Sequence, residues 1–271
     1  MASSGASVEE ARTAKAAAPK HPEPRRSAAL TSIYSTLYWP YLLTTCALLF
    51  FPALGIFIAT APFDRRRKLL HRYTSWWGGH YLAWAPLAGV RVEGRERLGE
   101  GPYVFVSNHQ SMVDILTVFA TRLDFLWVSK IENFYAPFLG WNMALNGYIP
   151  LKRGYLPSIM RMVRTCHKKI SQGHSLFVFP EGTRSPDGEI KKFYRGAFLI
   201  AARNKVPIVP LVLEGTNHVL PKHSYRINPQ KVLVRILDPV DPAEFDFDHR
   251  KLHDAVRDRM VTEQQRLRGQ E

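Results

Sequence analysis

The feature of this sequence that most constrains its structure is a long stretch, residues 27–63, that contains no charged side chain. It is strongly apolar and long enough to cross a bilayer, because a helix of about 20 residues spans the roughly 30 Å hydrocarbon core. We therefore predict a helical membrane anchor over residues 31–62, with a buried helix of a soluble protein as the alternative. Aromatic side chains of the kind found at membrane interfaces gather near its start: Tyr34, Tyr38, Trp39 and Tyr41.

Two prolines, Pro40 and Pro52, leave the path of this anchor open. Each removes a backbone donor and tends to kink a helix, so the segment either crosses the membrane or forms bent helices that lie within one leaflet. A cleaved signal peptide is disfavoured, because the apolar run begins too late in the chain and is too long. The basic residues 65–68 predict that the chain after the anchor is cytoplasmic, since positive charge favours that side.

The remaining composition bounds the domain organisation. Residues 1–30 are rich in Ala, Ser, Pro and basic residues, which predicts a disordered tail, and residues 63–271 are enough for one folded domain. A net charge of +14 favours polyanionic partners, either nucleic acid, an anionic bilayer or an acidic protein. The only two cysteines, Cys46 and Cys166, provide neither a disulfide framework nor a zinc site, and we expect both to be buried thiols.

After about residue 90, short β-rich runs alternate with helical patterns. This alternation predicts an α/β fold with a largely parallel mixed sheet flanked by helices. The helices expected there are residues 158–171, residues 197–204 and a charged surface helix after residue 245, whereas the aromatic segment 76–90 is expected to pack mainly in the core. The expected strands are residues 103–107, 125–129, 148–152, 175–179, 206–213 and 231–237.

A histidine and an aspartate follow the first of these strands, in the sequence SNHQSMVD. His109 lies where sites form in α/β sheets, at the carboxyl end of a strand, and a histidine there can act as a general base. Asp114 can return through a turn to hold the other ring nitrogen. The spacing alone is weak evidence, because His249/Asp254 and His253/Asp258 repeat it in the charged C-terminal segment. We interpret those two pairs as coincidences on a solvated helix face.

Polar and basic residues also follow three other expected strands. The strand at 175–179 leads into Pro180, Glu181, Gly182, Thr183 and Arg184, where proline and glycine break the strand and arginine offers donors for a phosphate. Each cation taken alone is more often ordinary surface, and Arg184 could simply pair with Glu181. Four strands that all end in polar or basic groups nevertheless favour a shared anion site. The other cations at these strand ends are Lys130, Lys152 and Arg153.

Four segments together resemble the conserved blocks of the glycerolipid acyltransferase family, whose best-known members are the 1-acyl-glycerol-3-phosphate (lysophosphatidic acid) acyltransferases. They are NHQSMVD, GYIPLKR, FPEGTRS and VPIVPLV, in that order, and the resemblance covers roughly residues 70–238. Residues 63–271 are accordingly expected to form an acyltransferase domain.

The resemblance implies transfer of a fatty acyl group to the free hydroxyl of a lysophospholipid, with acyl-CoA or acyl-carrier protein as co-substrate and no other cofactor or metal. His109 would take the proton of the hydroxyl and Asp114 would orient it, without a covalent intermediate on Ser111. The acceptor would be bound by Lys130, Arg153, Glu181, Gly182, Thr183 and Arg184. An anionic membrane surface would attract the basic chain.

Four other readings are weighed at this stage. The acceptor could be a different lysolipid, since the same blocks would serve. A hydrolase lacks support, because the sequence has no Gly-x-Ser-x-Gly elbow. A membrane-tethered protein that binds polyanions without catalysis fits the charge, but no nucleic-acid-binding module is recognisable and no nucleic acid is expected as a partner. A catalytically inactive scaffold is the last alternative.

Overall fold

The computed structural model describes residues 28–84 and 89–269. In the described chain, a seven-stranded sheet has the order β1-β7-β6-β2-β5-β3-β4. Every neighbouring pair is parallel except β6 and β7, which run antiparallel. The predicted α/β fold with a largely parallel mixed sheet is therefore confirmed. The strands are β1 (Val90–Glu93), β2 (Val104–Ser107), β3 (Leu126–Lys130), β4 (Ile149–Leu151), β5 (Leu176–Val178), β6 (Ile208–Glu214) and β7 (Val232–Ile236).

Six of these strands coincide with expected runs, and β1 was missed. Its sequence, VRVE, places charges at alternate positions, and it lies at the edge of the sheet, where only one neighbour stabilises it. The helices are α2 (Ala28–Thr60), α3 (Lys68–Trp84), α4 (Val113–Ala120), α5 (Leu139–Leu145), α6 (Leu156–Ser171), α7 (Gly196–Asn204), α8 (Thr216–Val219) and α9 (His249–Arg268), with 3-10 turns η1 (Arg95–Arg97), η2 (Ile131–Tyr135) and η3 (Pro242–Phe245).

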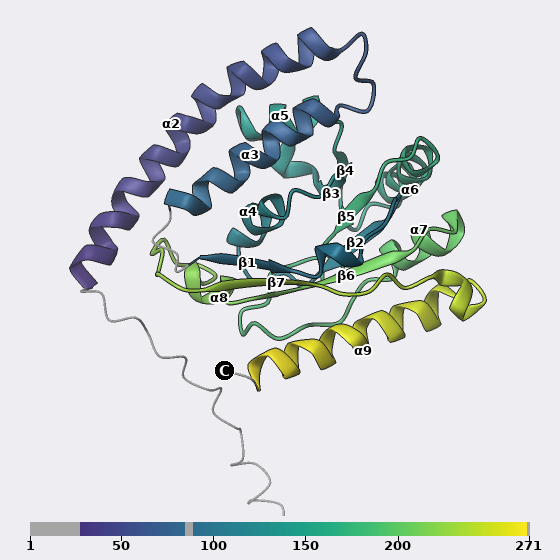
Figure 1. Ribbon diagram of the computed structural model, residues 1–271. Coiled ribbons are helices and arrows are strands. Elements are labelled where there is room, and N and C mark those ends of the chain that lie inside the picture. Colours follow the sequence, from purple (N-terminus) through teal and green to yellow (C-terminus); the bar gives the residue numbers. More distant parts are fainter. Residues whose placement is uncertain (1–27, 85–88, 270–271) are drawn as a thin grey trace, which may run out of the picture.

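Helices cover both faces of the sheet (Figure 1). On one face α4 lies next to the strands, α3 packs on α4, and α2 forms the outermost layer. Helices α6, α7 and α9 cover the other face. Parallel strands flanked in this way are buried on both sides and consist of nearly continuous apolar residues. Strand β6 is the clearest case, since all of its residues are buried.

Helix α2 is continuous through Pro40 and Pro52 and bends around the domain as a long arc (Figure 1). It is long and apolar enough to cross a membrane. One face packs on the domain, with Ala53 fully buried, and the backbone N–H of Ile227 donates to Ser35 Oγ (2.9 Å). The helix begins at Ala28, so the last residues of the predicted tail are helical, while residues 1–27 lie outside the described part. Its other face exposes large apolar side chains: Leu30, Ile33, Leu37, Leu43, Leu48, Phe51 and Ile58.

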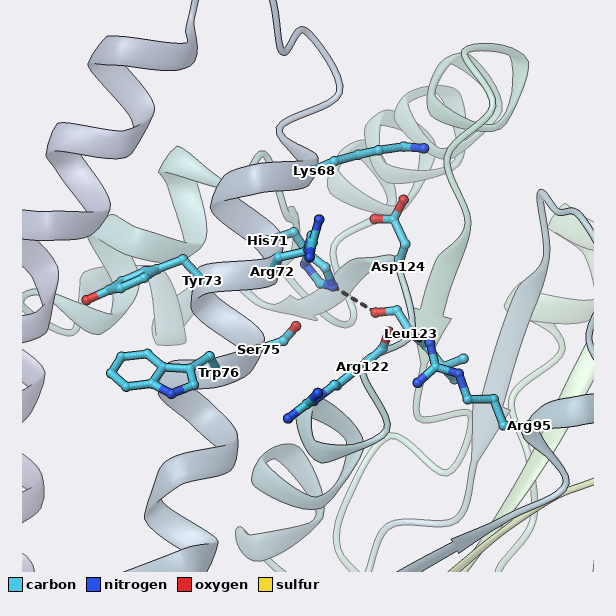
Figure 2. A pocket seen from close by; sticks show the side chains of 10 residues that line it. All are labelled: Lys68, His71, Arg72, Tyr73, Ser75, Trp76, Arg95, Arg122, Leu123 and Asp124. Carbon is cyan, nitrogen blue, oxygen red and sulfur yellow. Dashed lines mark hydrogen bonds between the residues drawn. The ribbon is translucent and has the colours of Figure 1, made fainter.

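Helix α3 joins α2 to the sheet. Its buried His71 bonds through Nε2 to the carbonyl of Leu123 (3.0 Å; Figure 2). Its Nδ1 bonds to the hydroxyl of Tyr148 (3.1 Å). A carbonyl can only accept, so Nε2 carries the proton and Nδ1 accepts from tyrosine. The aromatic segment expected in the core is divided: Trp77 is buried, whereas Trp76 is 55% exposed. Residues 85–88 of that segment lie outside the described residues.

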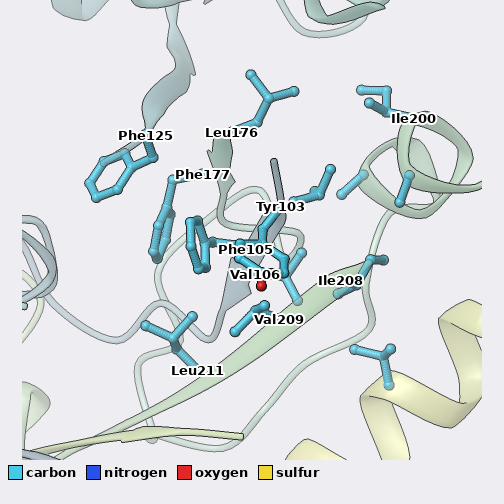
Figure 3. Packing of buried hydrophobic residues seen from close by; sticks show 14 of the residues in the cluster. Tyr103, Phe105, Val106, Phe125, Leu176, Phe177, Ile200, Ile208, Val209 and Leu211 are labelled. Atoms are coloured by element: carbon cyan, nitrogen blue, oxygen red, sulfur yellow. The ribbon is translucent and has the colours of Figure 1, made fainter. Parts of the chain in front are cut away.

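The main core lies between the sheet and the helices. Phe105 on β2, Phe177 on β5 and Phe125 directly before β3 meet at its centre (Figure 3), and their ring centroids lie 5.0 to 6.4 Å apart. Rings at these separations attract one another beyond the apolar area that they bury. Because these strands lead directly into the loops that follow, this rigid centre determines where the loop side chains lie. Cys166 is a buried free thiol as expected, whereas Cys46 is only partly buried.

Candidate active site

The loop after β2 is held rigidly before it presents any reactive group. The side-chain amide of Asn108 pairs with the backbone of Leu213 on β6. Its nitrogen donates to the Leu213 carbonyl (2.9 Å), and its oxygen accepts from the Leu213 N–H (2.8 Å). Gln110 donates to the same Leu213 carbonyl (3.0 Å) and to that of Gly188 (3.1 Å). Both side chains are buried, so their amides gain fully from these bonds. His109 therefore stands between two fixed neighbours.

Asp114 holds His109 as the spacing predicts. Its Oδ2 lies 2.7 Å from His109 Nδ1 and also accepts the backbone N–H groups of Gln110 (2.6 Å) and Ser111 (2.8 Å). The aspartate side chain is fully buried, and that of His109 is 15% exposed. Because the carboxylate accepts the hydrogen on Nδ1, the imidazole in this tautomer carries its free lone pair on Nε2. Nε2 has no hydrogen-bond partner among the described residues.

The loop after β5 closes over the same histidine. The ring of Phe179 stacks on the imidazole at 4.1 Å between centroids, almost parallel. Glu181 Oε1 accepts the backbone N–H of His109 (3.0 Å), and the carbonyl of His109 accepts the N–H of Ser185 (2.7 Å). Burial raises the pKa of Glu181 to about 7, which the nearby Asp114 reinforces. The loop after β5 is thus joined to the loop after β2 at one site.

Ser111, the one hydroxyl within the histidine loop, is engaged elsewhere. Its Oγ donates to the carbonyl of Leu220 (2.8 Å) and accepts the N–H of Val113 (3.2 Å). A serine nucleophile needs its hydroxyl bonded to a general base. Ser111 bonds only to backbone groups, so a direct attack by the substrate's own hydroxyl fits the geometry better than a covalent intermediate.

Arg184 belongs to the loop after β5, and Arg153 approaches the same loop from the segment after β4. A Cβ added to Gly182 would lie 4.0 Å from the guanidinium carbon of Arg153 and 2.8 Å from the ring of Tyr194. Gly182 has a φ of +70°, which also favours glycine there. Arg184 forms no ion pair with Glu181 or any other described carboxylate, which leaves its guanidinium available. Thr183, next to it, is exposed.

The other two predicted cations, Lys130 and Lys152, already have partners. Lys130 is half-exposed and lies 3.4 Å from Glu132, and Lys152 lies over the ring of Tyr155. A surface pair of this kind contributes little binding energy. Their neighbourhood is still continuous with Arg153, which helps to lower the pKa of Glu132. The predicted phosphate ligands therefore all lie at one edge of the sheet. They differ in that Lys130 and Lys152 already have partners, whereas Arg184 forms no ion pair with a described carboxylate.

The two other His-x₄-Asp spacings are not equivalents of this site. His249 begins α9. His253 was expected on a solvated face, and that expectation is wrong: it is buried, because its ring packs against Phe198 at 4.9 Å. Its Nδ1 pairs with the adjacent Asp254 (2.6 Å) and its Nε2 with the carbonyl of Phe193 (3.1 Å). With both ring nitrogens engaged, it serves a structural role.

Sequence reasoning missed several residues that build the site. Asn108 and Gln110 flank His109, yet nothing local shows that they reach Leu213, more than 100 residues away. In the sequence, Phe179 could be identified only as the end of an expected strand and not as the ring that stacks on His109. Tyr194 gave no signal at all. Apolar or amide residues directly beside a candidate catalytic group are the only hint that the sequence offers for such support.

The fold and the site now define a class. Residues 89–214 match the model of the acyltransferase family. A protein of Chlamydomonas reinhardtii is 31% identical over 229 residues, which is 81% of this chain and 67% of that protein. The chain belongs to the acyltransferase family.

The relatives narrow the class further. The Chlamydomonas protein is named a 1-acyl-sn-glycerol-3-phosphate acyltransferase, as is a chloroplastic protein of Brassica napus that is 38% identical over 189 residues, 68% of this chain. The chain spans about half (54%) of the Brassica protein's length. Among solved structures, the 1-acyl-sn-glycerophosphate acyltransferase PlsC of Thermotoga maritima superposes with a TM-score of 0.74 at 27% identity, covering 88% of this chain and 97% of that one.

Proposed function

We propose that this protein transfers a fatty acyl group from an acyl thioester to the free hydroxyl of 1-acyl-glycerol-3-phosphate, which yields phosphatidic acid. The observation that carries the proposal is the 2.7 Å pairing of His109 Nδ1 with Asp114, which leaves Nε2 as a base at a partly exposed strand end. The names of the relatives support the choice of acceptor.

In the proposed reaction the acceptor hydroxyl attacks the thioester carbonyl while His109 Nε2 takes its proton. The new C–O bond forms, the C–S bond breaks, and the proton passes from Nε2 to the departing thiolate. Asp114 keeps the imidazole in the productive tautomer and stabilises the imidazolium. General-base help of this kind contributes about 10²–10⁴ in rate. No acyl group is attached to the protein at any point.

The acceptor's phosphate would be bound by Arg153 and Arg184, with Lys130 in support. Arginine suits this task, because its planar fork of donors matches phosphate oxygens. Glu181 would shape the site by holding the backbone of His109, and Gly182 and Thr183 would line the loop. The thioester would come from acyl-CoA or acyl-carrier protein, and the basic surface fits either donor.

The anchor would lie in the cytoplasmic leaflet and not cross the bilayer. α2 packs along its inner face on α3 and α5, so a straight crossing would draw polar domain surface into the hydrocarbon region. Its exposed apolar face would instead face lipid, which matches a helix lying in the interface. Such a position delivers the active site to acceptors that reside in the membrane.

The decisive experiment is an acyl-transfer assay with lysophosphatidate and acyl-CoA in detergent. Wild type should form phosphatidic acid, and His109→Ala should lose about 10²-fold or more of kcat. His249→Ala is the matched control, since it removes a histidine with the same spacing to an aspartate, and it should keep wild-type activity. Transfer to no lysophospholipid by wild type, or full activity in His109→Ala, would overturn the proposal. If the protein prefers another lysolipid, the proposed acceptor is wrong but the proposed acyl transfer stands.

A further inference from the structure

A cavity lies at the edge of the sheet opposite to the edge that carries His109. It has a volume of about 690 Å³ and is formed by α3, the turn before β3 and the turn after β1 (Figure 2). β1 runs opposite to β2, so the carboxyl end of β1 and the amino end of β3 share this edge. The residues that matter here are Lys68, Arg72, Ser75, Trp76, Arg95 and Arg122.

The cavity is strongly positive. Four of its lining residues are cations, and among the described residues none of the four forms an ion pair; Asp124 is the one acidic residue in the lining. Arg95 is fixed by donating to the carbonyl of Thr121 (2.8 Å). Arg122 has a φ of +55°, an uncommon conformation for arginine. Figure 2 shows Arg72, Arg95 and Arg122 among the residues that line the cavity.

Ser75 supplies an unused hydrogen-bonding group within this positive lining. Its side chain is only 5% exposed, and its Oγ has no partner among the described residues. Figure 2 shows the hydroxyl directed toward the side where Arg122 and Leu123 lie. A buried hydroxyl without a partner costs free energy, so its presence indicates that a ligand completes the bond.

Two histidines in this neighbourhood are neutral at neutral pH. Burial lowers the pKa of His174 to about 4, and Lys169 and Arg66 lower it further. Burial also lowers the pKa of His71. The positive charge at the cavity therefore comes from its lysine and arginine side chains and not from these histidines.

The surface beside the cavity is apolar and continuous with α2. Trp76 lies in the lining and is 55% exposed, and its ring lies tilted against that of Tyr73, 5.5 Å between centroids. The hydroxyl of Tyr73 donates to the carbonyl of Leu49 on α2 (3.0 Å). Leu69, one position after Lys68, is also exposed. A small soluble anion would gain nothing from such neighbours, whereas a lipid presents a phosphate and acyl chains side by side.

We propose that this cavity binds the phosphate headgroup of an anionic membrane phospholipid, separately from the active site. Ser75 donates to a phosphate oxygen, Arg72 and Arg122 pair with its charge, and the acyl chains lie against Trp76 and the exposed face of α2. The site orients the protein on anionic membranes. The proposal does not depend on acyl transfer, because binding can be measured in the absence of any thioester.

The test measures partition of the full chain onto vesicles of phosphatidylcholine with and without phosphatidylglycerol. Each well-placed cation contributes about fivefold, so Arg72→Gln/Arg122→Gln should bind the anionic vesicles roughly 20- to 30-fold more weakly. Arg203→Gln/Arg250→Gln removes the same charge from α7 and α9 and should lose less than about threefold. Both double variants should bind neutral vesicles as wild type does.

The variant Ser75→Ala distinguishes binding within this cavity from attraction by the general positive charge of the surface. It changes no charge and removes a hydroxyl without a partner, so the thermal midpoint should not fall, whereas binding to anionic vesicles should weaken about fivefold. Equal losses in the two arginine pairs, or unchanged binding in Ser75→Ala, would overturn the proposal. So would inorganic phosphate that displaces the protein from anionic vesicles at unchanged ionic strength, because the ligand would then be a free anion.

Discussion

Glu181 Oε1 lies 3.0 Å from the backbone nitrogen of His109, and this contact joins two loops that are 72 residues apart in the chain. It places a buried carboxyl group within the same network as the His109–Asp114 pair. Because the two loops follow the parallel strands β2 and β5, the contact depends on the pairing of those strands. The site is therefore assembled at one edge of the sheet and not within one segment.

Asp114→Asn should reduce kcat by about 10²–10⁴-fold with a much smaller change in KM. The amide can still occupy the buried position, but it neither holds the Nδ1 proton reliably nor stabilises the imidazolium. Steady-state kinetics with lysophosphatidate would measure this. Circular dichroism should show an intact fold, and a loss confined to KM would argue against the orienting role.

Glu181 should make stability depend on pH. Its folded pKa of about 7 is above its ordinary value of 4.5, so the protonated form is favoured in the folded state. Its stabilising contribution is therefore present below about pH 4.5 and is lost as the pH rises through 7, by up to roughly 3 kcal/mol. Chemical unfolding of wild type and Glu181→Gln at pH 5 and pH 8 would measure this. The variant should gain stability relative to wild type at the higher pH, and a constant difference would contradict the prediction.

Arg153→Gln should raise KM for lysophosphatidate by about 10- to 100-fold while kcat changes less. A cation that binds the phosphate contributes equally to the ground state and the transition state. Lys130→Gln is the comparison, and its effect should be smaller because Lys130 already pairs with Glu132. Saturation kinetics in detergent would rank the two, and the reverse order would show that Lys130 is the main phosphate ligand.

Gly182→Ala should impair acceptor binding through strain. The new Cβ would meet the ring of Tyr194 at 2.8 Å, and alanine disfavours a φ of +70°. Such a backbone conformation costs alanine about 1 kcal/mol or more, in addition to the displaced ring. We expect a lower thermal midpoint and a raised KM. Gly196→Ala is the control, because its added Cβ meets nothing within 4 Å and should be tolerated.

Leu43→Ser/Leu48→Ser should weaken membrane association without loss of activity in detergent. Both side chains are exposed on α2, so their replacement removes lipid-facing apolar area and leaves the packing on the domain unchanged. Flotation with phosphatidylcholine vesicles would measure the change. Ala53→Leu addresses the opposite face of the helix: Ala53 is fully buried, so this variant should lower the thermal midpoint instead.

Much of the architecture could be predicted from local patterns. Six strands, the helices α6, α7 and α9, and the long apolar helix follow from periodicities that depend only on neighbouring residues. The edge strand β1 could not, because its alternating charges resemble a surface loop and only pairing with β7 stabilises it. His253 was misjudged for a related reason, since the charged residues beside it in the sequence gave no sign that its ring packs against Phe198.

The sequence by itself determined the candidates for catalysis and phosphate binding: His109, Asp114 and the basic residues at the strand ends stand out by type and position. Only the tertiary structure decided how they are supported. Leu213 fixes the histidine loop, Glu181 joins it to the next loop, and Ser75 faces a cavity that no motif indicates. The physical reason is the distance along the chain over which each kind of interaction acts. Periodicity and turn chemistry act over a few residues, whereas these contacts depend on how distant strands pair and helices pack.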